Sequence, residues 1–212
     1  MIVLRVKNVE FEVTYIDLRN KPDWFLEISP HGKVPVLKAD DDILFESNAI
    51  AEYLEETNEP RLHPADPIKR ARNRAWTEFV PNFSSALNGI YYTPTREAME
   101  EGLANAPERI QKVEDALAQR GNDGPFFNDD QLSLVDAAYA PFLQRFGVVE
   151  RVLQTGLLKN FPHVQAWSDT LLADDRVTGS VVSKFEDEFY KNLVRREHYV
   201  ASLMKPANVA AE

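Results

Sequence analysis

Cysteine is absent from this chain of 212 residues, so the chain as given can form no disulfide, thiolate metal site or cysteine nucleophile. Histidine is scarce as well, and we expect no metal site because the four histidines have no ligand-like spacing. They are His31, His63, His163 and His198. Basic side chains are in deficit, with 24 Lys and Arg against 34 Asp and Glu. Because nucleic-acid binding needs a basic face, we expect no nucleic-acid partner.

Long apolar runs are also missing. We find no stretch near the roughly 20 apolar residues of a membrane span, and no charged-then-apolar leader. Hydrophobic residues at 44% and charged residues at 27% are ordinary for a globular protein. We therefore expect a cytoplasmic protein without membrane contact, long enough for one large or two small domains.

The most informative stretch is a β-hairpin and helix predicted over residues 29–56. Two short apolar strands, 34–37 and 43–45, flank a turn of three aspartates, which suits a tight connection. Ser47 then begins a helix, because apolar side chains recur after it at helical spacing. These side chains belong to Ile50, Tyr53 and Leu54.

Two motifs in this stretch resemble the glutathione-binding half of a glutathione transferase. They are SPHGKVPVL at residues 29–37 and FESNAI at residues 45–50. In that family a Val-Pro pair with a cis proline and a Glu-Ser pair at a helix start bind the tripeptide. The resemblance covers nearly the whole chain. It implies an α/β thioredoxin-like N-terminal domain, truncated at its N-terminus, followed by an all-α C-terminal helical domain.

The resemblance places Met1 inside the family's first helix, which would end at Lys7-Asn8, and makes residues 11–18 a strand. The family's first strand, a central one, and the loop with its catalytic Tyr, Ser or Cys then have no counterpart here. Roughly 15–20 residues would supply them. We expect the protein to start upstream of Met1. The alternative is a remodelled sheet without the usual chemistry, and we assign no catalytic residue.

Composition predicts where the two domains divide. We expect a thioredoxin-like domain over residues 1–58 and a proline-rich linker over 59–66. An all-α domain should follow over 67–206, with a disordered tail at 207–212. A short helix is expected within 19–28, with Asn20 as its cap and an apolar side formed by Trp24, Phe25 and Ile28.

Three helices are predicted in the second domain, and the resemblance implies a fourth over residues 161–172. The first begins at Asp66-Pro67 and should be kinked by Pro81. The second runs from about 97 to 120. The third follows a capping signal at 133–136 and is nearly apolar all round, so we expect it at the domain's centre. Residues 177–200 form a charged, amphipathic segment.

The resemblance implies binding roles for five residues. Ser47 would bind the γ-glutamyl carboxylate at the positive end of its helix, and Glu46 would meet the amine. Val34-Pro35 would present backbone groups to the cysteinyl residue through a cis peptide bond, and Lys33 would pair with the glycine carboxylate. Two alternatives stay open: Glu46-Ser47 can simply cap the helix, and Lys33 can be a solvated surface lysine.

Other side chains are weaker candidates. His31 has no assigned role, and in the family a second-substrate pocket lies against the long helices of the second domain. Aromatic residues at helical spacing could line that pocket, although such residues are more often part of a core. They are Trp76, Phe79, Phe83, Tyr91 and Tyr139, and Arg74 could add polarity.

The implied function is transfer of glutathione, as a co-substrate, to a small hydrophobic electrophile. The Lys-Val-Pro form of the first motif favours a bacterial-type or tau/omega-like member, and the family implies a homodimer. The alternative is a non-catalytic member that binds glutathione or a protein partner.

Overall fold

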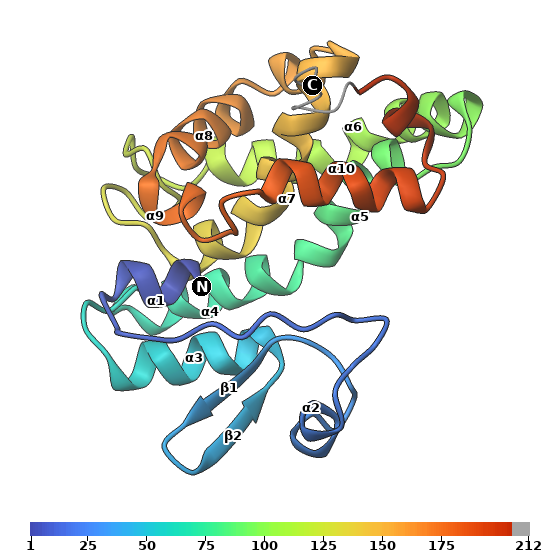
Figure 1. Ribbon diagram of the computed structural model, residues 1–212. Coiled ribbons are helices and arrows are strands. Elements are labelled where there is room, and N and C mark those ends of the chain that lie inside the picture. The colour runs from blue at the N-terminus through green and yellow to red at the C-terminus, as the bar shows by residue number, and fades with distance from the viewer. Residues whose placement is uncertain (205–212) are drawn as a thin grey trace. The chain divides into compact units, whose positions relative to one another are not determined.

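The computed structural model describes residues 1–204, so the predicted tail at 207–212 lies outside the described residues (Figure 1). The chain divides into two compact units. Unit 1 is Met1–His63, and unit 2 begins at Pro64.

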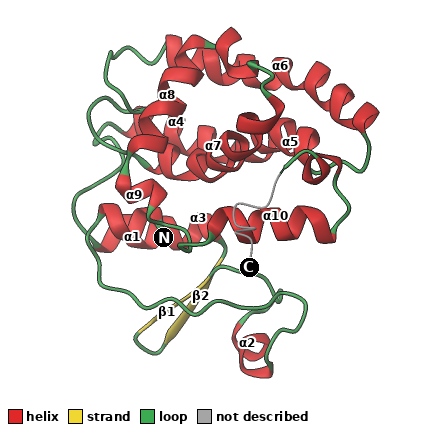
Figure 2. Cartoon of the chain, turned by 45° about the horizontal axis from the view of Figure 1, so that its top comes forward, coloured by secondary structure: helices red, strands yellow, loops and turns green. Residues whose placement is uncertain are grey.

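Unit 1 holds a two-stranded antiparallel sheet and three helices, which Figure 2 colours by type. The elements are α1 (Ile2–Val6), α2 (Asp23–Ile28), β1 (Val36–Ala39), β2 (Asp42–Phe45) and α3 (Ser47–Thr57). The strands pair from Val36 opposite Phe45 to Ala39 opposite Asp42, which leaves Asp40 and Asp41 as the turn. The predicted hairpin and the helix beginning at Ser47 are confirmed, and α1 lies where the resemblance placed the end of a helix.

The strand predicted over residues 11–18 is wrong, because no residue there belongs to a strand. Its side chains are poorly covered: Val13 is 40% exposed and Tyr15 is 63% exposed. Within residues 1–204, the sheet of unit 1 consists of β1 and β2 alone, so this segment has no ladder to join. Strand propensity reflects packing against neighbouring strands more than a backbone preference.

The helix predicted within 19–28 forms, but its start and its apolar side differ from the prediction. α2 begins at Asp23 with Pro22 at the N-cap, not with Asn20. A residue that precedes proline is disfavoured in helical conformation, so a helix cannot easily run from Asn20 through Lys21. Phe25 is 2% exposed, as an apolar anchor should be, whereas Trp24 is 48% exposed.

A buried ion pair holds unit 1 together. The ammonium of Lys7 lies 2.8 Å from Oε2 of Glu55 in α3, and its side chain is 0% exposed. Lys7 also donates to the carbonyl oxygens of Asn58 and Pro60, each at 2.8 Å. Glu55 in turn accepts from the backbone N–H of Leu62 and of His63, at 2.9 Å. The end of α1 is thereby joined both to α3 and to the segment that follows it.

Unit 2 is a helical bundle built around α7, which contacts α4, α5, α8 and α9. The α-helices are α4 (Pro67–Glu78), α5 (Val80–Tyr91), α6 (Arg96–Ala118), α7 (Leu134–Leu153), α8 (Pro162–Ala173), α9 (Asp175–Thr178) and α10 (Phe185–Arg195). Two 3-10 helices are η1 (Leu157–Asn160) and η2 (Tyr199–Ser202). Among residues 1–204, no helix is both long and apolar enough to cross a membrane.

The helix starts of unit 2 follow their capping residues. Asp66 accepts from the N–H of Lys69 at 2.8 Å and caps α4, as predicted. Ser133 and Asp136 form the predicted capping box of α7. Asp136 is fully buried and also accepts from Trp167 Nε1 at 2.5 Å. Instead of a kink at Pro81, the chain ends α4 at Glu78 and starts α5 at Val80.

Helices α5 and α6 approach closely at a pair of glycines. A Cβ on Gly102 would lie 2.1 Å from the carbonyl oxygen of Gly89, a distance that no real side chain tolerates. A Cβ on Gly89 would meet nothing within 4 Å. The close approach therefore depends on Gly102 alone.

Candidate functional site

A small pocket in unit 1 collects all five binding residues that the sequence suggested. It has a volume of ≈ 70 Å³ and is formed by the loop before β1 and by the junction of β2 with α3. Its lining residues are Ser29, His31, Lys33, Val34, Pro35, Phe45, Glu46 and Ser47. Two motifs separated by a hairpin therefore meet at one site.

The loop on one side of the pocket is fixed by its own hydrogen bonds. The hydroxyl of Ser29 donates to the carbonyl of Lys33 at 2.9 Å and accepts from the Lys33 N–H at 3.0 Å. Gly32 turns the chain between them at φ 57, a conformation that glycine adopts without strain. The Val34-Pro35 peptide is cis, as the resemblance implied. Val34 is 47% exposed, and both residues of this bond line the pocket.

The start of α3 forms the other side of the pocket. Glu46 occupies the N-cap position at φ 67 and ψ 122, and its carbonyl accepts from the N–H of Ile50 at 3.0 Å. The Glu46 side chain makes no capping hydrogen bond, so the geometry does not support a purely capping role for this residue. A positive φ is uncommon for a residue with a side chain and tends to occur where a ligand is held. Ser47 follows as the first helical residue, at the positive end of the helix dipole.

Two aromatic rings complete the wall. His31 lies edge-on to Phe45, with ring centroids 5.8 Å apart. Sequence reasoning placed Phe45 in a strand and at the start of the second motif, but gave it no binding role. Its position next to Glu46 was the signal that could have added it to the site.

Comparisons with known proteins agree with this arrangement. The glutathione S-transferase N-terminal domain family matches residues 1–57, and the corresponding C-terminal domain family matches residues 96–170. A probable glutathione S-transferase of Glycine max is 31% identical over 177 residues, covering 81% of this chain and 76% of that protein. The chain belongs to the glutathione S-transferase family.

Solved glutathione S-transferases have the same fold as this family member. A tau class enzyme from mango, Mangifera indica, superposes with a TM-score of 0.77 at 29% identity, covering 91% of this chain and 90% of that one. Rice GST1, solved in complex with glutathione, superposes with a TM-score of 0.77 at 26% identity, covering 92% of this chain and 91% of the rice chain. The predicted thioredoxin-like domain followed by an all-α domain is thus confirmed.

The aromatic candidates of this glutathione S-transferase divide into core and partly exposed residues. Phe83, Tyr91 and Tyr139 are at most 1% exposed, so they pack in the core of unit 2 and do not line a pocket. Burial raises the pKa of both tyrosines well above the usual range. Tyr139 donates to the carbonyl of Trp76 at 2.8 Å, while Trp76 itself is half-buried. Among residues 1–204, no group of three His, Asp or Glu side chains could hold a metal ion.

Proposed function

We propose that unit 1 binds glutathione in the pocket between the loop 29–35 and the start of α3. The observation that carries the proposal is the meeting of Val34-Pro35 with Glu46-Ser47 at one exposed site, where Glu46 has a positive φ. Family membership adds support, because rice GST1 was solved with glutathione bound.

Each end of the tripeptide has a matching group in this pocket. The first turn of α3 and the Ser47 hydroxyl can bind the γ-glutamyl carboxylate, because a helix N-terminus offers N–H donors and a positive dipole end. The carboxylate of Glu46 would accept the neighbouring amine in a charge-assisted hydrogen bond. Backbone groups of Val34, beside the cis Pro35, would pair with the cysteinyl residue, and Lys33 would meet the glycine carboxylate.

The pocket's size indicates which part of the ligand it encloses. A volume of ≈ 70 Å³ lies far below the roughly 300–1,000 Å³ of pockets that enclose a drug-sized ligand, so this pocket encloses only part of a tripeptide. We infer that the γ-glutamyl head enters the pocket and that the cysteinyl and glycyl residues lie along the exposed surface by Val34 and Lys33.

Calorimetric titration with glutathione tests this assignment. Ser47→Ala removes a hydroxyl that would donate to a carboxylate, a bond worth about 1.5–3 kcal/mol, so affinity should fall about 10–100-fold. Ser85→Ala is the matched control, because Ser85 is an exposed helical serine of unit 2. Equal affinity of the two variants would falsify the site.

For the reaction we propose attack of the bound glutathione thiolate on a small hydrophobic electrophile. A carbon–sulfur bond forms as the leaving group departs with its electron pair. No residue is assigned to thiol activation. In the described part of the chain, the pocket contains neither a tyrosine hydroxyl nor a thiol, and the Ser29 hydroxyl is bonded to Lys33.

The lack of a tyrosine hydroxyl or thiol in the pocket, as far as the described residues show, favours a second candidate. This candidate is a non-catalytic member that binds glutathione or a protein partner. Absorbance assays with glutathione and chlorodinitrobenzene separate the two. Turnover above the uncatalysed rate that Ser47→Ala reduces supports the enzyme. Glutathione binding without turnover supports the binding protein.

We also propose, from family membership, that the chain forms a homodimer and resides in the cytoplasm. Light scattering coupled to size-exclusion chromatography measures the mass of the protein in solution. A mass equal to that of one chain would contradict the dimer.

A further inference from the structure

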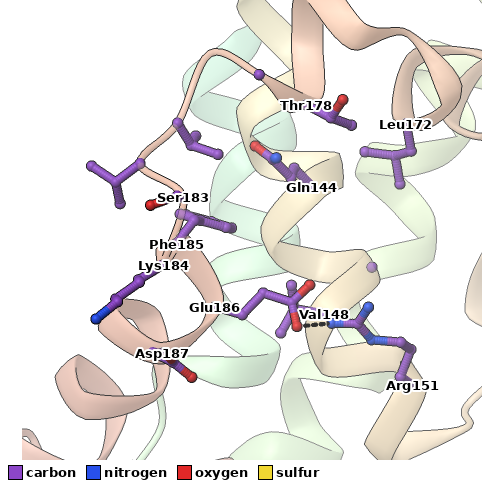
Figure 3. Close-up of a pocket in the computed structure, with 14 residues that line it drawn as sticks. Gln144, Val148, Arg151, Leu172, Thr178, Ser183, Lys184, Phe185, Glu186 and Asp187 are labelled. Carbon is purple, nitrogen blue, oxygen red and sulfur yellow. Dashed lines mark ion pairs between the residues drawn. The ribbon is translucent and has the colours of Figure 1, made fainter. Parts of the chain in front are cut away.

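A pocket of unit 2 and the glutathione pocket of unit 1 differ in how their polar groups are paired. The pocket of unit 2 has a volume of ≈ 860 Å³ and lies between α7 and residues 178–187, where Arg151 and Glu186 form an ion pair (Figure 3). In the glutathione pocket, by contrast, the backbone N–H of Val34 has no hydrogen-bond partner within residues 1–204. Because backbone donors in folded proteins are almost always paired, solvent or a ligand must complete this one.

Ser29 uses all of its polar groups to hold the loop before β1. Its N–H donates to the carbonyl of Phe25 at 2.9 Å, and its carbonyl accepts from the N–H of Gly32 at 2.9 Å. Its hydroxyl donates to the carbonyl of Lys33 at 2.9 Å and accepts from the N–H of Lys33 at 3.0 Å. Since Ser29 is only 4% exposed, water cannot easily replace these bonds, and the loop is ordered before any ligand arrives.

The bond from the Ser29 hydroxyl fixes the direction of the Val34 N–H. The carbonyl of Lys33 and the N–H of Val34 belong to one peptide unit, which is trans and planar, so the two groups point in opposite directions. Because the carbonyl is turned toward Ser29, the N–H is turned away from it. Pro35 has no N–H, so Val34 carries the last backbone donor before β1 begins at Val36.

Building on the glutathione site proposed above, we propose that Ser29 is a positioning residue. It holds the Val34 N–H in the orientation that pairs with the cysteinyl part of glutathione, and it thereby raises the affinity for the tripeptide. The gain comes from preorganisation, because a loop that is already ordered loses less conformational freedom on binding. Ser29 acts through the peptide unit between Lys33 and Val34 and not through a bond to the ligand.

Calorimetric titration with glutathione tests the role of the Ser29 hydroxyl. Ser29→Ala removes both bonds to Lys33 and should weaken binding about tenfold, whereas Ser29→Thr keeps the hydroxyl and should restore most of the affinity. Thr57→Ala is the matched control, because the Thr57 hydroxyl also donates to a backbone carbonyl of unit 1, that of Tyr53 at 2.7 Å, but does not line the pocket. Equal affinities of Ser29→Ala and Thr57→Ala would overturn the proposal, as would equal losses in the alanine and threonine variants.

Amide signals in solution separate positioning from a general loss of structure. In Ser29→Ala, the Lys33 amide should exchange with solvent at least about tenfold faster, because it loses its acceptor. Amides of α3 should exchange as in the unmodified protein, and glutathione should shift the Val34 amide signal less than it does there. Faster exchange throughout α3 would mean that Ser29 merely stabilises unit 1, and would refute the positioning role.

The result for Ser47→Ala separates the role of Ser29 from the glutathione site itself. If Ser47→Ala weakens glutathione binding and Ser29→Ala does not, the site stands and the positioning role is refuted. If the unmodified protein binds no glutathione, the proposed function and the role of Ser29 fail together.

Discussion

Replacing Glu55 with glutamine should destabilise unit 1 more than any exchange of a surface charge in this unit. The carboxylate of Glu55 is buried and accepts from Lys7, Leu62 and His63. Glutamine has the same shape, but it turns one acceptor oxygen into an NH₂ donor. That donor would face groups that are themselves donors, and Lys7 would lose its counter-charge.

The expected loss of stability follows from the burial of the ion pair between Lys7 and Glu55. Removing one partner of a buried ion pair leaves an uncompensated charge and costs about 3–5 kcal/mol. Lys7 keeps its two bonds to carbonyl oxygens, so we expect the low end, about 3 kcal/mol. A domain of this size has a total stability of only about 3–9 kcal/mol. Adding Lys7→Met removes the unpaired charge, so the double variant should lose less stability than the two single variants summed.

Hydrogen exchange of the amides in α3 measures this loss within unit 1. A change of about 3 kcal/mol corresponds to about a hundredfold faster exchange for amides that open with the whole unit. The matched control is Glu59→Gln, since Glu59 pairs with Arg61 while its side chain is 73% exposed. Exposed pairs contribute about 0–1 kcal/mol. If Glu55→Gln speeds exchange no more than Glu59→Gln, the reasoning about the buried pair is wrong.

Three further predictions concern pH and the packing of unit 2. Burial raises the pKa of Glu55, but hydrogen bonds from Lys7 and the backbone outweigh it and hold the pKa below 4.5. The stability that Glu55 contributes is therefore present above pH 4.5 and is lost as the pH falls further. In urea unfolding, acidification should lower the free energy of unfolding less for Glu55→Gln than for the unmodified protein. Asp136→Asn disturbs a buried carboxylate with four donor contacts and should cost about 3 kcal/mol in urea unfolding, whereas the exposed Asp115→Asn should change little; equal effects would contradict this account. Gly102→Ala should lower the melting temperature strongly because its methyl group meets Gly89, while Gly89→Ala should not, and similar temperatures would disprove the close approach.

Local rules predicted most of the elements. The hairpin, the helix beginning at Ser47 and the capping box at Ser133 depend on residues close in sequence, and all three form. The strand predicted over residues 11–18 failed because a strand forms only beside a partner strand, and the sheet within residues 1–204 offers this segment none. Trp24 was placed on the apolar side of α2, although its exposure depends on packing that periodicity cannot report.

Sequence alone could name the residues of the glutathione pocket but not the buried ion pair of unit 1. The five residues of the glutathione pocket lie in two motifs, so a resemblance was enough to name them before any geometry was known. The buried pair of Lys7 and Glu55 was missed because 48 positions separate its partners and no motif links them.

The backbone conformation of Glu46 costs stability, while its side chain supplies a carboxylate to the proposed glutathione site. At φ 67 a side chain is strained by about 1–3 kcal/mol, and glycine would relieve that strain. Glycine would also delete the carboxylate assigned to the ligand's amine. A Glu46→Gly variant should therefore be more resistant to unfolding but bind glutathione more weakly, so stability would rise while ligand affinity falls.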